Sequence, residues 1–265
     1  MEQPAVALNE VTVYRRGTRV LGPLTATIPA GSFCGVIGPN GAGKSTFLRV
    51  ITGHQKPSQG SVTVLGNAQY HSGALPRSKL IGILLQHHDF FPDIPFTVDD
   101  IVLFGRSPFH GPGIRYDATD HETRERALEI MDLTGYRHRL YRELSGGEQR
   151  KVHLARLIAQ NPDLLLLDEP ASGLDLEWQE RLTRLVGNLF RMLNRTVIMV
   201  THDISRLPSC CNRVILLKNG SVMCEGTPGD VLTAPLLSEL YGCGVDVSSD
   251  EGRFIITSVQ PQEYS

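Results

Sequence analysis

Residues 38–45, which read GPNGAGKS, restrict the possible folds of this chain more than any other segment. The apolar run 33–37 before them is typical of a buried strand, and the stretch 44–52 after them is typical of a helix. The segment matches the pattern G-x-x-x-x-G-K-[ST] in the context that this pattern requires. Its glycines let backbone N–H groups turn toward phosphate oxygens, and the helix N-terminus adds a favourable dipole. The segment therefore predicts a strand–loop–helix unit that binds phosphate.

Two side chains of this loop have distinct expected tasks. Lys44 is expected to bridge the β- and γ-phosphates of a nucleotide, and the Ser45 hydroxyl is expected to ligate Mg²⁺. ATP and Mg²⁺ are thus the predicted ligands. The predicted nucleotide-binding residues of this segment are Gly38, Pro39, Asn40, Gly41, Ala42, Gly43, Lys44, Ser45 and Thr46.

A second feature is a strand that ends in two acids. Residues 164–167 are four leucines, and Asp168 and Glu169 follow them. A central parallel strand is apolar throughout, and ligands gather at its carboxyl end. Asp168 is expected to reach Mg²⁺ through water, and Glu169 is expected to act as the general base that polarises an attacking water. An acidic pair by itself would also suit a solvated turn or a helix cap.

A third feature precedes a helical stretch that runs to about residue 160. Two glycines and a serine at a helix N-terminus form a second anion site, with N–H groups and a hydroxyl. One domain with one ATP does not need two phosphate cradles, so a head-to-tail homodimer is predicted, in which each second cradle closes on the partner's nucleotide. Its residues are Leu144, Ser145, Gly146, Gly147 and Glu148.

Residues 144–149 resemble the signature motif of the ABC transporter ATPases, and they lie shortly before the strand with the two acids, as in that family. The resemblance covers nearly the whole chain. It implies an ATP hydrolase that energises membrane transport, with Lys44 and Glu169 in catalytic roles.

The resemblance also implies roles for residues that are ambiguous alone. Tyr14 is similar to an aromatic that stacks on adenine, although it would also suit a strand. Gln86 resembles the Q-loop glutamine, which senses Mg²⁺ and water, and His202 resembles the switch histidine that contacts the γ-phosphate. Alone, a polar strand end and a helix cap would explain these two. The segment that resembles the D-loop, which crosses the dimer interface, is Ser172, Gly173, Leu174 and Asp175.

The fold class expected from these features is α/β. A P-loop NTPase core with a mostly parallel sheet is joined by an N-terminal antiparallel β subdomain and an inserted helical subdomain. Residues 1–265 form one domain, in which 1–86 and 161–265 make up the core and 87–160 the helical subdomain. Strands are expected at 6–13 and 19–28, helices at 98–105 and 119–133, and a hairpin around Asn219-Gly220.

Bulk properties exclude several classes of protein. The 265 residues are 41% hydrophobic and 20% charged, as in ordinary globular proteins, and the formal net charge of −2 argues against a nucleic-acid partner. No apolar run reaches the ~18 residues needed to span a bilayer. The five cysteines show no metal-binding spacing and are expected to be reduced thiols.

The cargo is predicted from two further segments. Residues 102–108, with the sequence VLFGRSP, and the tail segments 227–232 and 240–242 resemble the importers of ferric siderophores, haem, cobalamin and related metal chelates. The expected partners are a second copy, integral membrane permease subunits and, indirectly, a substrate-binding protein, at the cytoplasmic face of the inner membrane. The alternatives are a zinc, manganese or molybdate importer, an exporter, and a transport-independent ABC ATPase.

Overall fold

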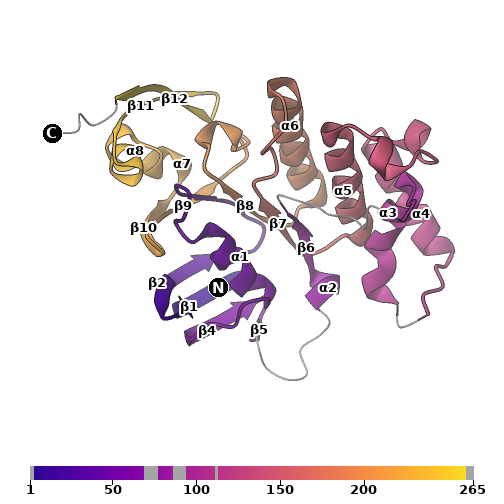
Figure 1. The fold of residues 1–265 in the computed structure, drawn as a ribbon, viewed down its shortest axis with the longest axis horizontal. Coiled ribbons are helices and arrows are strands. Elements are labelled where there is room, and N and C mark those ends of the chain that lie inside the picture. The colour runs from indigo at the N-terminus through magenta and orange to yellow at the C-terminus, as the bar shows by residue number, and fades with distance from the viewer. Residues whose placement is uncertain (1–2, 69–76, 86–93, 111–112, 261–265) are drawn as a thin grey trace.

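The computed structural model describes residues 3–68, 77–85, 94–110 and 113–260. Within this described part, the largest sheet has six strands in the order β10-β9-β3-β8-β7-β6 (Figure 1). All of them run parallel except β10, which pairs antiparallel with β9. The strand bounds are β3 Phe33–Ile37, β6 Ile81–Leu84, β7 Leu164–Asp168, β8 Thr196–Thr201, β9 Arg213–Lys218 and β10 Ser221–Gly226.

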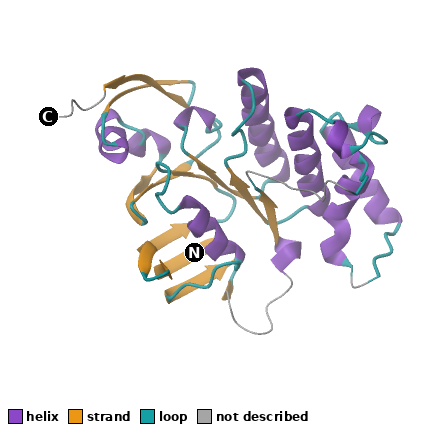
Figure 2. Cartoon of the chain, viewed as in Figure 1, coloured by secondary structure: helices purple, strands orange, loops and turns teal. Residues whose placement is uncertain are grey.

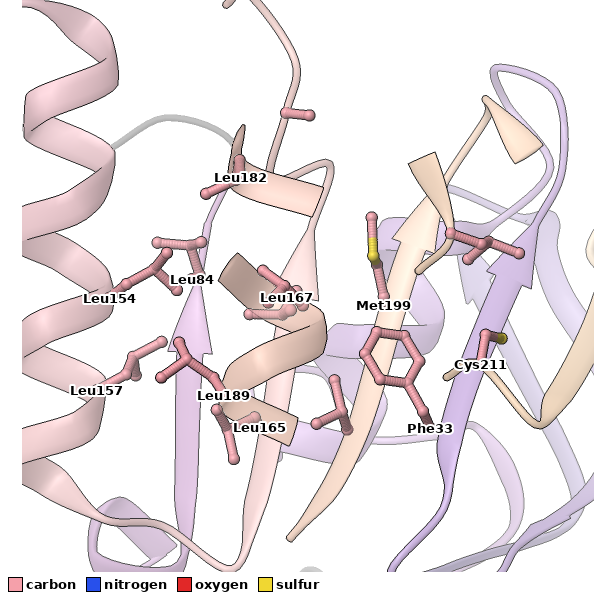
Figure 3. Packing of buried hydrophobic residues seen from close by; sticks show 14 of the residues in the cluster. Phe33, Leu84, Leu154, Leu157, Leu165, Leu167, Leu182, Leu189, Met199 and Cys211 are labelled. Carbon is pink, nitrogen blue, oxygen red and sulfur yellow. The ribbon is translucent and has the colours of Figure 1, made fainter. Parts of the chain in front are cut away.

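Both faces of this sheet are covered, which explains the unbroken apolar sequence of β7. Leu165 and Leu167 belong to a core cluster that contains residues of α5 (Gly146–Gln160) and α6 (Leu176–Leu193), as Figure 3 shows. Leu164 and Leu166 belong to a second cluster, with residues of α1 (Lys44–Thr52). A strand that is buried on both faces needs apolar residues at every position rather than at alternate ones.

The expected antiparallel β unit at the N-terminus is present as a separate sheet (Figure 2). Its described strands lie in the order β2-β1-β4-β5, and they share the second core cluster with α1. The two long strands extend slightly beyond the predicted ranges, to residues 15 and 18. The bounds are β1 Val6–Arg15, β2 Thr18–Ile28, β4 Gln59–Val64 and β5 Asn67–Ala68.

Helices follow β6 in sequence, and their starts are set by capping boxes. Thr97 caps α3 reciprocally with Asp100, and Asp117 caps α4 with Asp120 in the same way. α3 and α4 both pack on α5. The predicted helix 98–105 changes to 3₁₀ geometry after Leu103. The bounds of these elements are α2 Arg77–Leu80, α3 Val98–Leu103, η1 Phe104–Phe109, α4 Ala118–Ile130, η2 Thr134–Tyr136 and η3 Tyr141–Glu143.

The C-terminal segment contains elements that the sequence did not predict. After the expected β9–β10 hairpin, two short helices lead into a second hairpin. These helices and this hairpin, residues 228–260, form the C-terminal unit, which is yellow in Figure 1. β11 packs on α8, and β12 packs on the 3₁₀ turn η4 (Ile204–Arg206). The bounds are α7 Pro228–Val231, α8 Ala234–Tyr241, β11 Gly244–Asp250 and β12 Arg253–Gln260.

The five cysteines, all within the described residues, are free thiols, as expected. Burial raises the pKa of the Cys34 thiol, which keeps it protonated and unreactive. Among the described helices, none has both the length and the apolar composition that crossing a bilayer requires.

The start of α5 packs closely against α6 through a glycine. A Cβ at Gly147 would lie 2.3 Å from the nearest ring carbon of Trp178 on α6, a distance that requires the indole to move. A Cβ at the adjacent Gly146 would meet only Leu174, at 3.7 Å, which is an ordinary contact. Gly147 thus fixes how closely the N-terminus of α5 approaches α6.

This difference predicts opposite results for two matched substitutions. Gly147→Ala should lower the free energy of unfolding by about 1–3 kcal/mol, because the added methyl group overpacks the contact with Trp178. Gly146→Ala should be neutral or stabilise the protein by up to about 1 kcal/mol, because alanine favours the helix. Urea titration followed by circular dichroism measures both values. Equal stabilities for the two variants would contradict the packing argument.

Candidate active site

The phosphate-binding loop lies between β3 and α1, as predicted. Gly43 precedes the first residue of α1 with φ 99°, a conformation that is strained for any side chain. At Gly38 a Cβ would lie 2.4 Å from the Leu217 carbonyl oxygen, so the loop needs glycine there because it passes close to β9. The first turn of α1 leaves N–H groups without intrahelical partners at this loop. The backbone is therefore shaped to present N–H groups to an anion.

Lys44 lies within the loop and next to an acid. Its ammonium group donates to the carbonyl oxygens of Gly38 (2.7 Å) and Pro39 (3.1 Å), and it lies 3.8 Å from Oε1 of Glu169. Burial lowers the pKa of Lys44, and the carboxylates of Glu169 and Asp168 oppose this shift. A buried cation with acidic neighbours and a short reach to the loop is suited to binding phosphate oxygens.

Glu169 follows β7 in a left-handed conformation, with φ 47°. Such a conformation is uncommon for a residue other than glycine. It is held by two backbone hydrogen bonds, from Glu169 N to the Val200 carbonyl (2.9 Å) and from Ser172 N to the Glu169 carbonyl (3.0 Å). The strained backbone directs the carboxylate toward Lys44 and His202.

His202 completes this group from the end of β8. Its Nδ1 lies 2.9 Å and 3.0 Å from the two carboxylate oxygens of Glu169. The imidazole is 55% exposed, whereas the Glu169 side chain is only 11% exposed, so the histidine forms the solvent side of the pair. The contact brings a potential proton carrier against the predicted general base.

The strand register explains why these residues meet. Ile37 of β3 lies opposite Thr201 of β8, and Asp168 of β7 lies opposite Val200 of β8. The three strands therefore end at almost the same level, and the residues that follow them lie side by side at one edge of the sheet. Ligands bind at this edge in open parallel sheets.

Asp168 differs from Glu169 in its environment. Burial raises the pKa of the Asp168 carboxyl, and repulsion from Glu169 adds to this effect. Asp168 and Ser45 both line the cavity at this edge, so a carboxylate and a hydroxyl are available for a cation that prefers oxygen ligands. A divalent cation would offset the repulsion between the two acids, and the residues therefore fit Mg²⁺.

The cavity itself has a volume of about 750 Å³ and is lined mostly by polar groups. It includes Asn40 to Thr46 of the loop, the acids Asp168 and Glu169, Ser172 and His202. Three arginines that the sequence analysis missed also line it: Arg15 from β1, Arg19 from β2 and Arg49 from α1. No motif identifies them, because they reach the cavity only through the packing of β1, β2 and α1 around the loop. Their charge makes the cavity suited to a polyanion.

The other predicted site residues lie elsewhere. Tyr14 is on β1, 48% exposed, next to Arg15 but not among the residues that line the cavity. Gln86 lies outside the described residues. Of the segment 172–175, Ser172 lines the cavity, and the Asp175 carboxylate caps α6 by accepting the backbone N–H of Trp178 at 2.9 Å. Stacking on adenine and contact with a partner remain predictions.

The second predicted cradle is built as a capped helix start. Ser145 is the N-cap of α5, and its hydroxyl donates to Oε2 of Glu148 (2.8 Å) and accepts the Glu148 backbone N–H (3.3 Å). Leu144 is buried, whereas Ser145 and Gly146 are exposed. None of the residues 144–148, all described, lines the cavity of the phosphate loop. The predicted second cradle is therefore separate from the phosphate loop of the same chain.

Comparison with known proteins shows which family has a similar sequence. Residues 21–172 match the model of the family described as ABC transporter. The petrobactin import ATP-binding protein of Bacillus anthracis is 36% identical over 91% of this chain and 88% of its own length. The hemin import ATP-binding protein of Escherichia coli O157:H7 is 35% identical over 92% and 95%, respectively.

A solved structure extends the similarity to the fold. An ABC transporter of metal-chelate type, in an inward-facing conformation, superposes with a TM-score of 0.81 at 28% identity, over 98% of both chains. The match therefore includes the antiparallel sheet, the helices after β6 and the C-terminal unit. The phosphate loop, the acids after β7 and the sequence of the α5 start all lie within the matched ranges. This chain belongs to the ABC transporter family.

Proposed function

We propose that this chain is the ATP-hydrolysing subunit of an importer for iron or other metal chelates, and that it acts as a homodimer. The observation that supports ATP hydrolysis most directly is that Lys44, Glu169 and His202 meet at one polar cavity, which the phosphate loop also lines. A loop that only bound nucleotide would not need an acid and a histidine in contact at its γ-phosphate side.

The residues divide the hydrolysis of ATP between them. The loop N–H groups and Lys44 bind the phosphates, and Glu169 accepts a proton from the water that attacks the γ-phosphorus. As the new P–O bond forms, the bond to the β,γ-bridging oxygen breaks, and ADP and phosphate result. His202 orients the water and the γ-phosphate. Tyr14 stacks on adenine, and the reaction depends mainly on positioning and charge stabilisation.

The Ser45 hydroxyl and, through water, Asp168 would hold Mg²⁺, with Gln86 as a further predicted ligand. When bound, Mg²⁺ neutralises charge that develops on the phosphate oxygens. Ser45 and Asp168 both line the cavity, and their oxygen atoms are the type of ligand that Mg²⁺ prefers.

The separation of the two anion-binding features supports a dimer. Residues 144–148 do not line the cavity of their own chain, although Ser145 and Gly146 are exposed at the N-terminus of α5. In a head-to-tail pair, each α5 start contacts the ATP in the partner's loop, and residues 172–175 lie at the interface. ATP favours the closed pair because only then do both features contact one ligand, and hydrolysis removes that contact.

The cargo follows from the relatives. Proteins named for petrobactin import and hemin import are more than a third identical over nine-tenths of the chain, and the matching structure is of metal-chelate type. This supports import of an iron chelate such as a siderophore or haem. The subunit associates with membrane permeases at the cytoplasmic face of the membrane, and a substrate-binding protein delivers the chelate on the other side.

Substitution of the predicted base tests the hydrolytic role. Glu169→Gln preserves the shape of the side chain but removes the base, so ATP turnover should fall by at least about a hundredfold. Light scattering should then show a dimer that depends on ATP, because the variant binds ATP without cleaving it. Glu177→Gln, at an exposed position of α6, should retain wild-type turnover. Full turnover in Glu169→Gln, with no dimer, would refute the assignment.

Mixing two inactive variants tests whether the α5 start acts on the partner's ATP. Lys44→Gln inactivates the loop, and Ser145→Arg blocks the second cradle, so each purified variant should lack turnover. A mixture contains heterodimers in which one site combines an intact loop with an intact partner cradle, and ATPase activity should return. If both features serve the same chain's nucleotide, every chain keeps its own defect, and the mixture stays inactive.

A further inference from the structure

The C-terminal unit contacts His202, the residue whose imidazole lies against the Glu169 carboxylate. Tyr241 is the last residue of α8, and its hydroxyl donates a hydrogen bond of 2.8 Å to the backbone carbonyl oxygen of His202. A carbonyl can only accept, so the phenol must be the donor. The two residues are 39 positions apart, and the hydrogen bond therefore exists only because α8 folds back onto the end of β8.

Packing and hydrogen bonds hold Tyr241 in its position. The ring packs against the first core cluster. α8 ends immediately after Tyr241, because Gly242 adopts φ 70° and donates its N–H to the Ser238 carbonyl (2.9 Å). Ser238 Oγ also accepts the backbone N–H of Val245 (2.9 Å), which fastens α8 to β11. The phenol is thus presented to His202 by a helix that is fixed at its C-terminal end.

The surroundings keep the phenol in the donor form. Burial raises the pKa of Tyr241 to about 12, and the carboxylates of Asp203 and Glu169 and the thiol of Cys243 act in the same direction. The hydroxyl therefore remains protonated at physiological pH and can maintain the hydrogen bond.

The hairpin after α8 is anchored to α6, the helix that follows residues 172–175. Arg253 of β12 forms two hydrogen bonds with the carboxylate of Glu180, at 2.8 Å and 3.0 Å. Hydrogen bonding to Arg253 lowers the pKa of the Glu180 carboxyl, so the pair stays charged at neutral pH. The C-terminal unit therefore contacts both the end of β8, through Tyr241, and α6, through Arg253.

We propose that Tyr241 is a positioning residue for His202: its hydroxyl fixes the His202 backbone, and thereby holds the imidazole in contact with the Glu169 carboxylate. This inference rests on the proposed ATPase function. Tyr241 contacts no reacting atom, so its removal should weaken hydrolysis without changing how tightly ATP binds. It also gives the C-terminal unit, which lies outside the phosphate loop and the acidic strand, a role in the reaction.

Removal of one hydroxyl tests the proposal. Tyr241→Phe should lower kcat by about three- to tenfold, the effect of one hydrogen bond, while KM for ATP stays within about twofold. The control is Tyr116→Phe, which removes the hydroxyl of another half-buried tyrosine. That hydroxyl shares a 2.9 Å hydrogen bond with Ser107, and neither residue lines the cavity. This variant should keep the wild-type kcat. An unchanged kcat in Tyr241→Phe would overturn the proposal.

A double-mutant cycle distinguishes positioning from a general loss of stability. Because Tyr241 acts through the imidazole, Tyr241→Phe should cause no further loss in a His202→Ala background, measured by single-turnover hydrolysis with enzyme in excess. The same fold-loss in both backgrounds would mean that Tyr241 acts elsewhere, and the proposal would be wrong.

Hydrogen exchange tests the contact independently of activity. Peptides that contain residues 200–206 should exchange faster in Tyr241→Phe than in the wild type and in Tyr116→Phe, and equal rates would contradict the proposal. The proposed function fails separately, if wild type and Glu169→Gln hydrolyse ATP equally. The exchange result decides the Tyr241 contact in that case as well.

Discussion

The environment of the Glu169 carboxylate is the constraint on which the site depends. A nearly buried carboxylate needs polar partners within the protein to replace the water that it loses. Here the ammonium group of Lys44 lies 3.8 Å away, and Nδ1 of His202 lies 2.9 Å away. Each of the three groups follows a different strand. The site therefore exists only while β3, β7 and β8 keep their register.

That register depends on burial of the sheet on both faces. The alternating leucines of β7 belong to two core clusters, one with α5 and α6 and the other with α1. A shift by one residue would exchange these faces and move Glu169 away from Lys44. Apolar burial on both faces thus sets the position of a polar site that lies at the sheet edge. The strained φ of Glu169 is tolerated because neighbouring backbone hydrogen bonds hold it.

Different parts of the chain surround the group of Lys44, Glu169 and His202. The antiparallel sheet supplies Arg15 and Arg19 to the cavity, whereas residues 144–148 at the start of α5 do not line it. The C-terminal unit contacts this group through the hydrogen bond from the Tyr241 hydroxyl to the His202 carbonyl oxygen. In the proposed function, ATP binding, closure of the dimer and hydrolysis would use different surfaces of one domain, so that ATP could couple them.

Much of this architecture could be predicted from local patterns. The segment 38–45, the four leucines before Asp168, and Ser145 with its two glycines each encode their own structure within a few residues, because turn chemistry, strand burial and helix capping are local. The order of these motifs identified the family, and a tail resemblance indicated the cargo class. The same local signals predicted the α/β class, the antiparallel N-terminal sheet and the helices after β6. What only the tertiary structure decided are the contacts between distant segments: Glu169 with Lys44 and His202, the arginines of the cavity, Gly147 against Trp178, and Tyr241 beneath His202. These pairs are set by strand register and helix packing, which sum over the whole core, so no short stretch of sequence contains them.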